Sequence, residues 1–277
     1  MRSFLADLFR LLFKISFFRK RYYGIHKRIF NPLHLFRGVV KRIHLNNTIW
    51  FDLHIDDWIQ ENLFFINEYE AGEMKLMKRF LKPGDVFIDI GANIGLHTLF
   101  ASAIVSNRGM VFSFEPFSEN YNLLQHNISL NNASNVVAER IAVSDLKQQI
   151  DIRYDTSHAN SGMASAYLPG FSQYETVDSI SLDEYLFYHQ IERVNFIKID
   201  IEGGEYPALS GMRETLKKFN PIILLEINKE ILSFTPYAEK DITDFLKSMG
   251  YTSGGLTDDN IPPLSTHNFL FLKNSLL

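Results

Sequence analysis

From residue 86 onward, the chain repeatedly passes from a short apolar run to a longer segment with an apolar stripe at helical spacing. Short apolar runs are typical of strands buried on both faces, and their alternation with helices indicates a parallel sheet covered on both sides. The pattern therefore predicts an α/β fold. The expected strands are residues 86–91, 110–116, 136–143, 194–200 and 221–227.

Helical periodicity predicts helices over the segments between these strands and over one segment that precedes them. Alternating apolar and polar residues before that helix predict a strand or hairpin at 49–59, and a second hairpin is expected to close the chain near 253–260 and 267–274. Residues 147–185 break the alternation, and we interpret them as a strand pair flanking a polar loop, inserted over the carboxyl edge of the sheet. The expected helices are residues 69–81, 96–106, 118–132, 206–219 and 238–250.

The N-terminal segment, residues 1–44, differs from the rest in charge. Its 11 basic residues against one acid give it a net charge of +10, whereas 17 basic and 31 acidic residues give residues 45–277 a net charge of -14. Because residues 45–277 are this acidic, they would repel phosphate groups, and nucleic acid is an unlikely partner. We expect a basic extension over 1–44 and a catalytic domain over 45–277.

The start of this extension is apolar, but its charges interrupt any run long enough to span a membrane or act as a signal peptide. Helical spacing gives it two faces, which predicts a basic amphipathic helix. Such a helix can lie on an anionic membrane, dock on its own domain or bind a second subunit. The polar face carries Ser3, Asp7, Arg10, Lys14 and Arg21, and the apolar face carries Leu5, Leu8, Phe9 and Leu12.

Cysteine is absent from the sequence, which excludes disulfides, thiolate metal sites and cysteine nucleophiles. Nothing in the composition argues for an oxidising compartment. We therefore expect a cytoplasmic protein, with peripheral attachment to the membrane through residues 1–44 as an option.

The glycine-rich turn after the first expected strand is the most informative segment. Asp89 is followed by Gly91, Asn93 and Gly95, and a helix begins directly afterwards. Glycines let the backbone turn tightly and approach a ligand, but a dinucleotide fingerprint would need glycine at positions 93 and 96. Glu115 ends the next strand, where a carboxylate can accept hydrogen bonds from both hydroxyls of a ribose. The alternative for Glu115 is a helix cap.

These motifs resemble the FkbM family of S-adenosylmethionine-dependent methyltransferases, and the resemblance runs from Tyr69 to Leu272. It implies a class I, Rossmann-like methyltransferase sheet and S-adenosyl-L-methionine as cofactor. It also implies O-methylation of a hydroxyl on a sugar, glycan, glycolipid or other small acceptor. The strings that carry it include YEAGE, LKPGDVFIDIGANIGLHT, FSFEP, RIAVSD, FIKIDIEGGEYPALSG and IILLEI. The expected cofactor-binding residues are Glu70, Asp89, Gly91, Asn93, Gly95, Glu115 and Ala142.

Acidic residues also end the later strands, where ligands of open parallel sheets bind. Asp200 is the expected general base, with Glu202 and Glu205 beside it, because neighbouring carboxylates and burial are expected to raise its pKa. The alternative is that Asp200 only accepts hydrogen bonds from the loop. His97 is the alternative base, since imidazole titrates near neutrality.

Substrate recognition is expected from a polar loop in the insertion, with His158, Asn160 and Ser161, and from Glu226 at the end of the last strand. We expect no bound metal, although Asp200, Glu226 and Asn228 could offer hard oxygen ligands.

Two other functions compete with this one. A nucleic-acid methyltransferase is disfavoured because no N/D-P-P-F/Y motif is present, and a non-catalytic membrane scaffold is disfavoured by the intact acids.

Overall fold

The computed structural model describes residues 1–45, 47–154, 164–254 and 263–274. These residues form two compact units, which we call the N-terminal unit, residues 1–69, and the catalytic unit, which begins at Glu70. The division falls beyond the boundary expected at residue 44. Residue 44 lies inside a strand, so the basic extension is part of a larger folded unit. The strand or hairpin expected at 49–59 occurs as a strand over Ile49–His54 that pairs with the strand containing residue 44, and a helix begins at Trp58.

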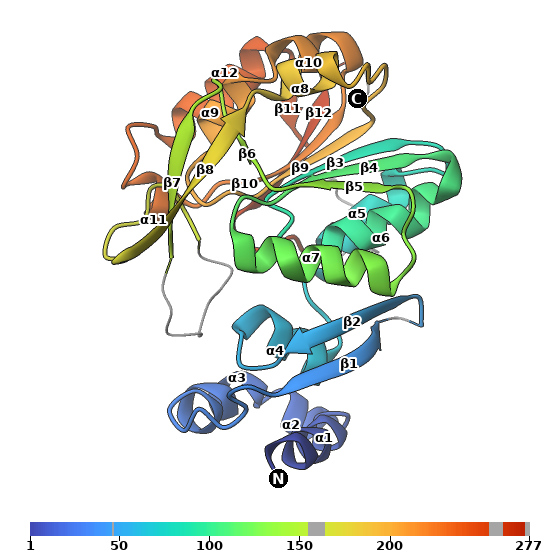
Figure 1. The fold of residues 1–277 in the computed structure, drawn as a ribbon, viewed down its shortest axis with the longest axis vertical. Helices are drawn as coiled ribbons and strands as arrows, with labels where there is room; N and C mark the ends of the chain where they lie inside the picture. Colours follow the sequence, from blue (N-terminus) through green and yellow to red (C-terminus); the bar gives the residue numbers. More distant parts are fainter. Residues whose placement is uncertain (46, 155–163, 255–262, 275–277) are drawn as a thin grey trace. The chain divides into compact units, whose positions relative to one another are not determined.

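The N-terminal unit combines short helices with one antiparallel hairpin (Figure 1). Strand β1 (Val40–Leu45) pairs with β2 (Ile49–His54). Its core is rich in aromatic side chains: Phe13 and Phe51 are fully buried, and Phe13 makes an edge contact with Phe65 at 5.5 Å between ring centroids. The helices are α1 (Arg2–Leu12), α2 (Ser16–Arg19), α3 (Tyr22–Ile25), a π-helix (His26–Phe30) and α4 (Trp58–Ile66).

Helix α1 packs on its own unit, one of the options left open by the sequence. Phe9 contacts Phe30, with 4.9 Å between ring centroids, and Ala6 is fully buried. However, Leu8, which was expected on the packed face, is 53% exposed. A stripe at spacings of three and four residues therefore faces outward: Phe4, Leu8 and Leu11.

The catalytic unit is built on a seven-stranded sheet of order β11-β12-β10-β9-β3-β4-β5. The five strands from β10 to β5 are parallel. At one edge of the sheet, β12 pairs antiparallel with both β10 and β11. This confirms the expected α/β sheet. A hairpin also closes the described chain, but its first strand is Tyr251–Ser253, whereas the expected first arm was 253–260, of which residues 255–260 lie outside the described residues. The strands are β3 (Val86–Ile90), β4 (Met110–Phe114), β5 (Val136–Glu139), β9 (Phe196–Ile199), β10 (Ile222–Glu226), β11 (Tyr251–Ser253) and β12 (Asn268–Lys273).

Helices cover both faces of this sheet, and Figure 1 shows α5, α6 and α7 on one face and α8, α9, α10 and α12 on the other. The apolar strands are buried as expected: every residue of β3 and of β9 is buried. The helices are α5 (Ala71–Phe80), α6 (Leu96–Val105), a 3-10 turn (Ser106–Arg108), α7 (Ser118–Leu130), α8 (Leu182–Tyr188), α9 (Glu205–Ser210), α10 (Arg213–Phe219), α11 (Lys229–Leu232) and α12 (Glu239–Ser248).

Two expected elements are divided in the structure. Residues 136–143 form β5 and a separate strand, β6 (Ala142–Val143), which belongs to a different sheet. The helix expected at 206–219 is two helices, α9 and α10, separated near Gly211. A Cβ atom on Gly211 would lie 2.0 Å from the carbonyl oxygen of Ser144, so the chain bends where the two backbones meet. Apolar periodicity does not reveal such a contact.

The insertion contains the expected antiparallel strand pair, β7 (Gln149–Tyr154) and β8 (Gln173–Ile180), and β6 pairs with β8 to complete a three-stranded sheet. Residues 155–163, the first half of the polar loop between β7 and β8, lie outside the described residues. Within the part of the chain that the structure describes, no helix has the length and apolarity needed to cross a bilayer.

Candidate active site

The glycine turn after β3 is held in place by close contact with the end of β9. Gly91 has a φ of +82°, and a Cβ atom there would lie 1.8 Å from the carbonyl oxygen of Asp200. Only glycine tolerates both the backbone conformation and the contact. Gly95, with a φ of +95°, then starts α6. The glycine turn after β3 and the acidic segment after β9 are therefore in direct contact.

Asp89 lies at the end of β3 and is fully buried. One carboxylate oxygen, Oδ2, accepts a hydrogen bond of 2.6 Å from the Thr98 hydroxyl, which also lies 2.8 Å from the Ser113 hydroxyl. The other oxygen, Oδ1, has no hydrogen-bond partner among the described residues. A buried acceptor without a donor is costly, so this oxygen suits a ligand that donates a hydrogen bond.

Glu115 follows β4 and is tied to the glycine turn. Its Oε2 accepts from the backbone N–H of Asn93 at 2.7 Å, and its Oε1 accepts from that of Phe117 at 3.0 Å. Burial raises the pKa of Glu115 to about 7, although these two N–H groups oppose the rise. A carboxylate has about four acceptor positions, so each oxygen can accept one further hydrogen bond. Glu115 is thus positioned for a diol.

The end of β9 holds a buried ion pair that sequence analysis missed. The Lys198 ammonium is buried and lies 2.8 Å from Asp200 Oδ2. Burial alone would raise the pKa of Asp200, but the Lys198 charge and neighbouring hydrogen bonds overcome it and hold the pKa below its usual range. The expectation of a raised pKa at Asp200 is therefore wrong. Asp200 is a stable anion.

The raised pKa values belong to the glutamates around Asp200. Oxygens of Asp200, Glu202 and Glu226 all lie within 4.8 Å of one another. Burial and the negative charge of Asp200 raise the pKa of Glu226 far above its usual range, and the same causes raise that of Glu202 to about 8. Burial also raises the pKa of Glu205 to about 7. We call Asp200, Glu202 and Glu226 the carboxylate cluster.

The turn that carries Glu202 is fixed by several contacts. Glu202 has a φ of +50°, a conformation that costs free energy in residues other than glycine, and its carbonyl accepts a 2.6 Å hydrogen bond from the Ser165 hydroxyl. Glu205 Oε1 accepts from the backbone N–H of Gly203 at 2.9 Å. Glu202 Oε2 is buried without a hydrogen-bond partner in the described chain. Strain and an unsatisfied oxygen together indicate a functional group.

His97 and Glu70 lie together at the starts of α6 and α5. His97 Nε2 is 3.1 Å from Glu70 Oε2, and both side chains are largely buried. Glu70 has a φ of +48°. Ala142 is buried in β6 beside Phe117 and Ile152. His97 Nε2 and Glu70 Oε2 are close enough for an ion pair, yet each is buried without a hydrogen-bond partner among the described residues, so His97 remains the alternative base.

The remaining candidates fall outside the site or outside the described residues. His158, Asn160 and Ser161 lie in the range 155–163, which the structure does not describe. Asn228, considered above as a possible metal ligand, uses its side-chain oxygen to cap α11 by accepting from the N–H groups of Glu230 and Ile231.

Sequence reasoning also overlooked two residues of the insertion that approach the cluster. Besides Ser165, Tyr167 lies next to Gly203, and its pKa is raised by burial and by nearby acidic groups that include Glu205. The lysine in the string KID was the available signal for Lys198, but nothing in the sequence pointed to Ser165 or Tyr167.

Residues 89–253, more than half of the chain, match the model of the methyltransferase FkbM domain. The chain belongs to the FkbM methyltransferase family. S-Adenosylmethionine is the cofactor, and the matched range contains the glycine turn, Glu115 and the carboxylate cluster. The resemblance inferred from the motifs is confirmed.

Among curated relatives, this FkbM methyltransferase is 28% identical to the hexuronic acid methyltransferase AglP of Haloferax volcanii, over 64% of this chain and 67% of that protein. Methyltransferase 1 of Beauveria bassiana is 27% identical over 47% of this chain and 59% of its own length. A solved FkbM methyltransferase from Methylobacillus flagellatus superposes with a TM-score of 0.45 at 18% identity, over 76% of this chain and 52% of that one.

The residues at the strand ends fit the cofactor. The unsatisfied Oδ1 of Asp89 and the free acceptor positions of Glu115 match its donor groups. When bound, S-adenosylmethionine supplies an electrophilic methyl group on a sulfonium. The chain itself supplies the acceptors that orient the ligand and, at the end of β9, carboxylates that can take a proton.

Proposed function

We propose that this enzyme transfers the methyl group of S-adenosylmethionine to a hydroxyl of a sugar that carries an acidic group. The observation that carries the proposal is the carboxylate cluster, because its Asp200 directly contacts the glycine turn through the backbone. The name of the relative from Haloferax volcanii, a hexuronic acid methyltransferase, favours a uronic acid as acceptor. The buried Lys198 beside the cluster balances part of its negative charge.

In the proposed reaction, the acceptor hydroxyl forms a bond from its oxygen to the methyl carbon as the bond from that carbon to sulfur breaks. The hydroxyl proton passes to a carboxylate of the cluster. A base works best when its pKa is close to the working pH, and Glu202, with a pKa of about 8, meets this condition better than Asp200. We assign proton removal to Glu202 and orientation of the hydroxyl to Asp200.

A transfer assay tests the proposal. The full-length protein is incubated with S-adenosylmethionine labelled in its methyl group and with glucuronosides, neutral glucosides and RNA. We expect label on the glucuronosides, at a hydroxyl that mass spectrometry locates. Methylation confined to RNA would favour the competing nucleic-acid methyltransferase. Absence of label from every acceptor, despite cofactor binding, would favour a non-catalytic scaffold.

Cofactor affinity should depend on Glu115. Glu115→Ala removes the acceptor proposed for the ribose hydroxyls, so we expect at least a tenfold weaker Kd, about 1.4 kcal/mol. Only the ionised carboxylate accepts from both hydroxyls at once, so affinity of the unmodified protein should rise with pH through about 7. Isothermal titration at about pH 6 and about pH 8 measures both effects. Equal affinity in a folded Glu115→Ala variant would contradict the assignment.

We also propose that the N-terminal unit binds an anionic membrane surface through the outward stripe of α1. Phe4, Leu8 and Leu11 are exposed on this helix, and exposed Arg2 and Lys14 lie close to them in the chain. Apolar residues beside cations suit an interface with anionic lipid. This contact would be electrostatic as well as hydrophobic.

The triple variant F4S/L8S/L11S should abolish co-sedimentation with vesicles that contain phosphatidylserine, and salt should weaken the binding of the unmodified protein. It is preferable to a deletion of residues 1–23, since Phe13 and Tyr22 belong to the core. Leu146→Ser, at an exposed apolar residue of the catalytic unit, is the matched control. An unmodified protein that ignores these vesicles at low salt would exclude membrane binding.

A further inference from the structure

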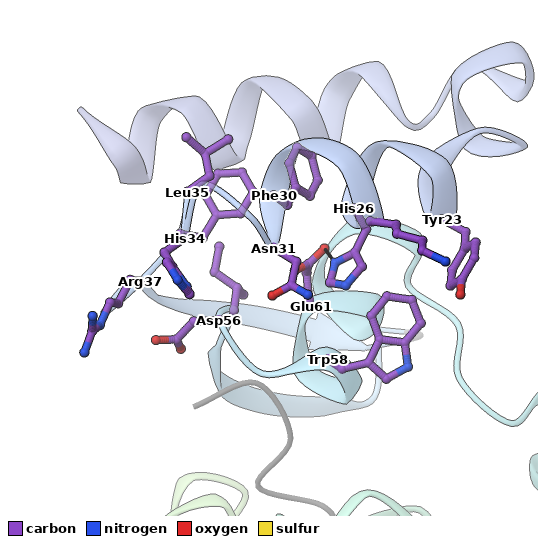
Figure 2. Close-up of a pocket in the computed structure, with 13 residues that line it drawn as sticks. Tyr23, His26, Phe30, Asn31, His34, Leu35, Arg37, Asp56, Trp58 and Glu61 are labelled. Carbon is purple, nitrogen blue, oxygen red and sulfur yellow. Dashed lines mark hydrogen bonds and ion pairs between the residues drawn. The ribbon is translucent and has the colours of Figure 1, made fainter. Parts of the chain in front are cut away.

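The N-terminal unit contains a pocket of about 640 Å³, a volume within the usual range for small-molecule sites. Figure 2 shows that its lining side chains come from α3, the π-helix and the segment that follows it, the residues between β2 and α4, and α4 itself. The lining is aromatic and apolar with a few charged groups. None of these residues falls within the range matched by the FkbM domain.

The aromatic end of the pocket is fixed by a buried hydrogen-bond network. Glu61 Oε1 accepts a hydrogen bond from the Tyr22 hydroxyl at 2.9 Å and lies 2.9 Å from His26 Nδ1. The His26 ring in turn contacts Trp58, with 4.4 Å between ring centroids, and Tyr23 makes an edge contact with the same indole at 6.0 Å. Trp58 is therefore held as a rigid platform, partly open to solvent.

The backbone around the pocket is unusual. Residues His26–Phe30 form a π-helix, which is rare and often marks functional positions. His34 has a φ of +43°, a strained conformation for this residue. Such features cost free energy, and a rigid, ligand-binding shape would explain why they are kept.

The other end of the pocket carries charged side chains of both signs, Arg37 and Asp56, with His34 between them. Figure 2 shows Arg37 and His34 at the end away from Trp58. The Arg37 side chain has no ion-pair partner among the described residues, and the hydrogen bond donated by the Arg2 side chain is accepted by the Arg37 backbone carbonyl. Of the two pocket acids, Glu61 is held in the network described above, and Asp56 Oδ2 accepts a hydrogen bond from the Gly38 N–H at 2.9 Å, which turns this oxygen toward the backbone.

We propose that this pocket binds an acidic pyranose, the apolar face of its ring against Trp58 and its acid group at Arg37. Aromatic rings bind the apolar face of sugars, and the guanidinium fork matches a carboxylate or a phosphate. The N-terminal unit would thus recognise an acidic sugar through its own residues. This inference rests on the proposed acidic sugar acceptor.

Tryptophan fluorescence tests the pocket without any methyl transfer. The chain has two tryptophans, so Trp50→Phe leaves Trp58 as the single emitter. In this full-length background, titration with methyl glucuronoside, glucose 6-phosphate and methyl glucoside should change Trp58 emission with the two acidic sugars only. The acidic sugar that binds more tightly shows whether the pocket prefers a carboxylate or a phosphate.

Arg37→Gln should weaken that response at least tenfold. Lys20→Gln, which removes a charge from the same unit outside the pocket, should leave it unchanged. Equal responses to acidic and neutral sugars, no response at all, or a response that survives Arg37→Gln would overturn the proposal. Because no cofactor is needed, failure here is distinct from failure of the transfer assay.

Discussion

Asp200→Asn is expected to lower turnover by about 10²- to 10⁴-fold and to destabilise the fold as well. The substitution removes the anion proposed to orient the acceptor hydroxyl. It also leaves the buried Lys198 ammonium without its 2.8 Å partner, a loss of about 3 kcal/mol. Turnover on a verified acceptor and the free energy of unfolding measure the two effects, while the Kd for the cofactor should change little.

The double variant Lys198→Met/Asp200→Asn separates the chemical role of Asp200 from the structural one. Removing both charges should restore most of the stability, because no unpaired charge remains, while turnover stays low. If turnover recovers together with stability, Asp200 acts only as the partner of Lys198.

Chelation tests the metal alternative. The Lys198 ammonium already faces the cluster, so we expect EDTA to leave turnover unchanged. Loss of activity in EDTA and its return with Mg²⁺ would instead assign a metal to the cluster.

Glu202→Gln is expected to reduce turnover by a similar factor and to change its pH dependence. The pKa of Glu202 is raised to about 8, so its carboxyl group is largely protonated at neutral pH and ionises above pH 8. If Glu202 removes the proton, turnover of the unmodified enzyme should rise with pH through about 8, and this rise should disappear in the variant. Profiles of kcat measured with saturating sugar, whose hydroxyls do not titrate in this range, provide the readout.

Glu205→Gln is the matched control, since the pKa of Glu205 is also raised but lies near 7. It should keep the rise near pH 8. A profile that is unchanged by Glu202→Gln but altered by Glu205→Gln would transfer the role of base to Glu205.

Much of the catalytic unit could be predicted because each strand there is a continuous apolar run. Four of the five expected strands and four of the five expected helices occur as single elements near their expected positions, since buried strands and covering helices leave strong periodic signals. The failures, at Gly211 and between Glu139 and Ala142, arise from contacts between distant segments. The extent of the N-terminal unit was harder to predict. The expected boundary at residue 44 was drawn from the distribution of charged residues, which lie on the surface and do not show which segments share a core.

The site could be predicted by residue type but not by charge state. The acids at the strand ends were identified from their positions after apolar runs, yet the protonation of each depends on where Lys198 points. A lysine inside an apolar strand carries no visible partner in the sequence. For the same reason the hydrogen bond from Asn93 to Glu115, which joins the glycine turn to the next strand, required the structure.

The contact between Gly91 and the Asp200 carbonyl restricts how such an enzyme can diversify. Because the donor-binding turn and the strand end with the reacting groups share one backbone junction, a change of main-chain path in either would disturb both. Acceptor preference must then vary through parts that do not enter this junction, such as the β7–β8 insertion or the N-terminal unit. Engineering toward a new sugar should therefore randomise those segments, apart from Ser165 and Tyr167, which contact the Glu202–Gly203 turn, and keep residues 89–95 and 198–205 constant.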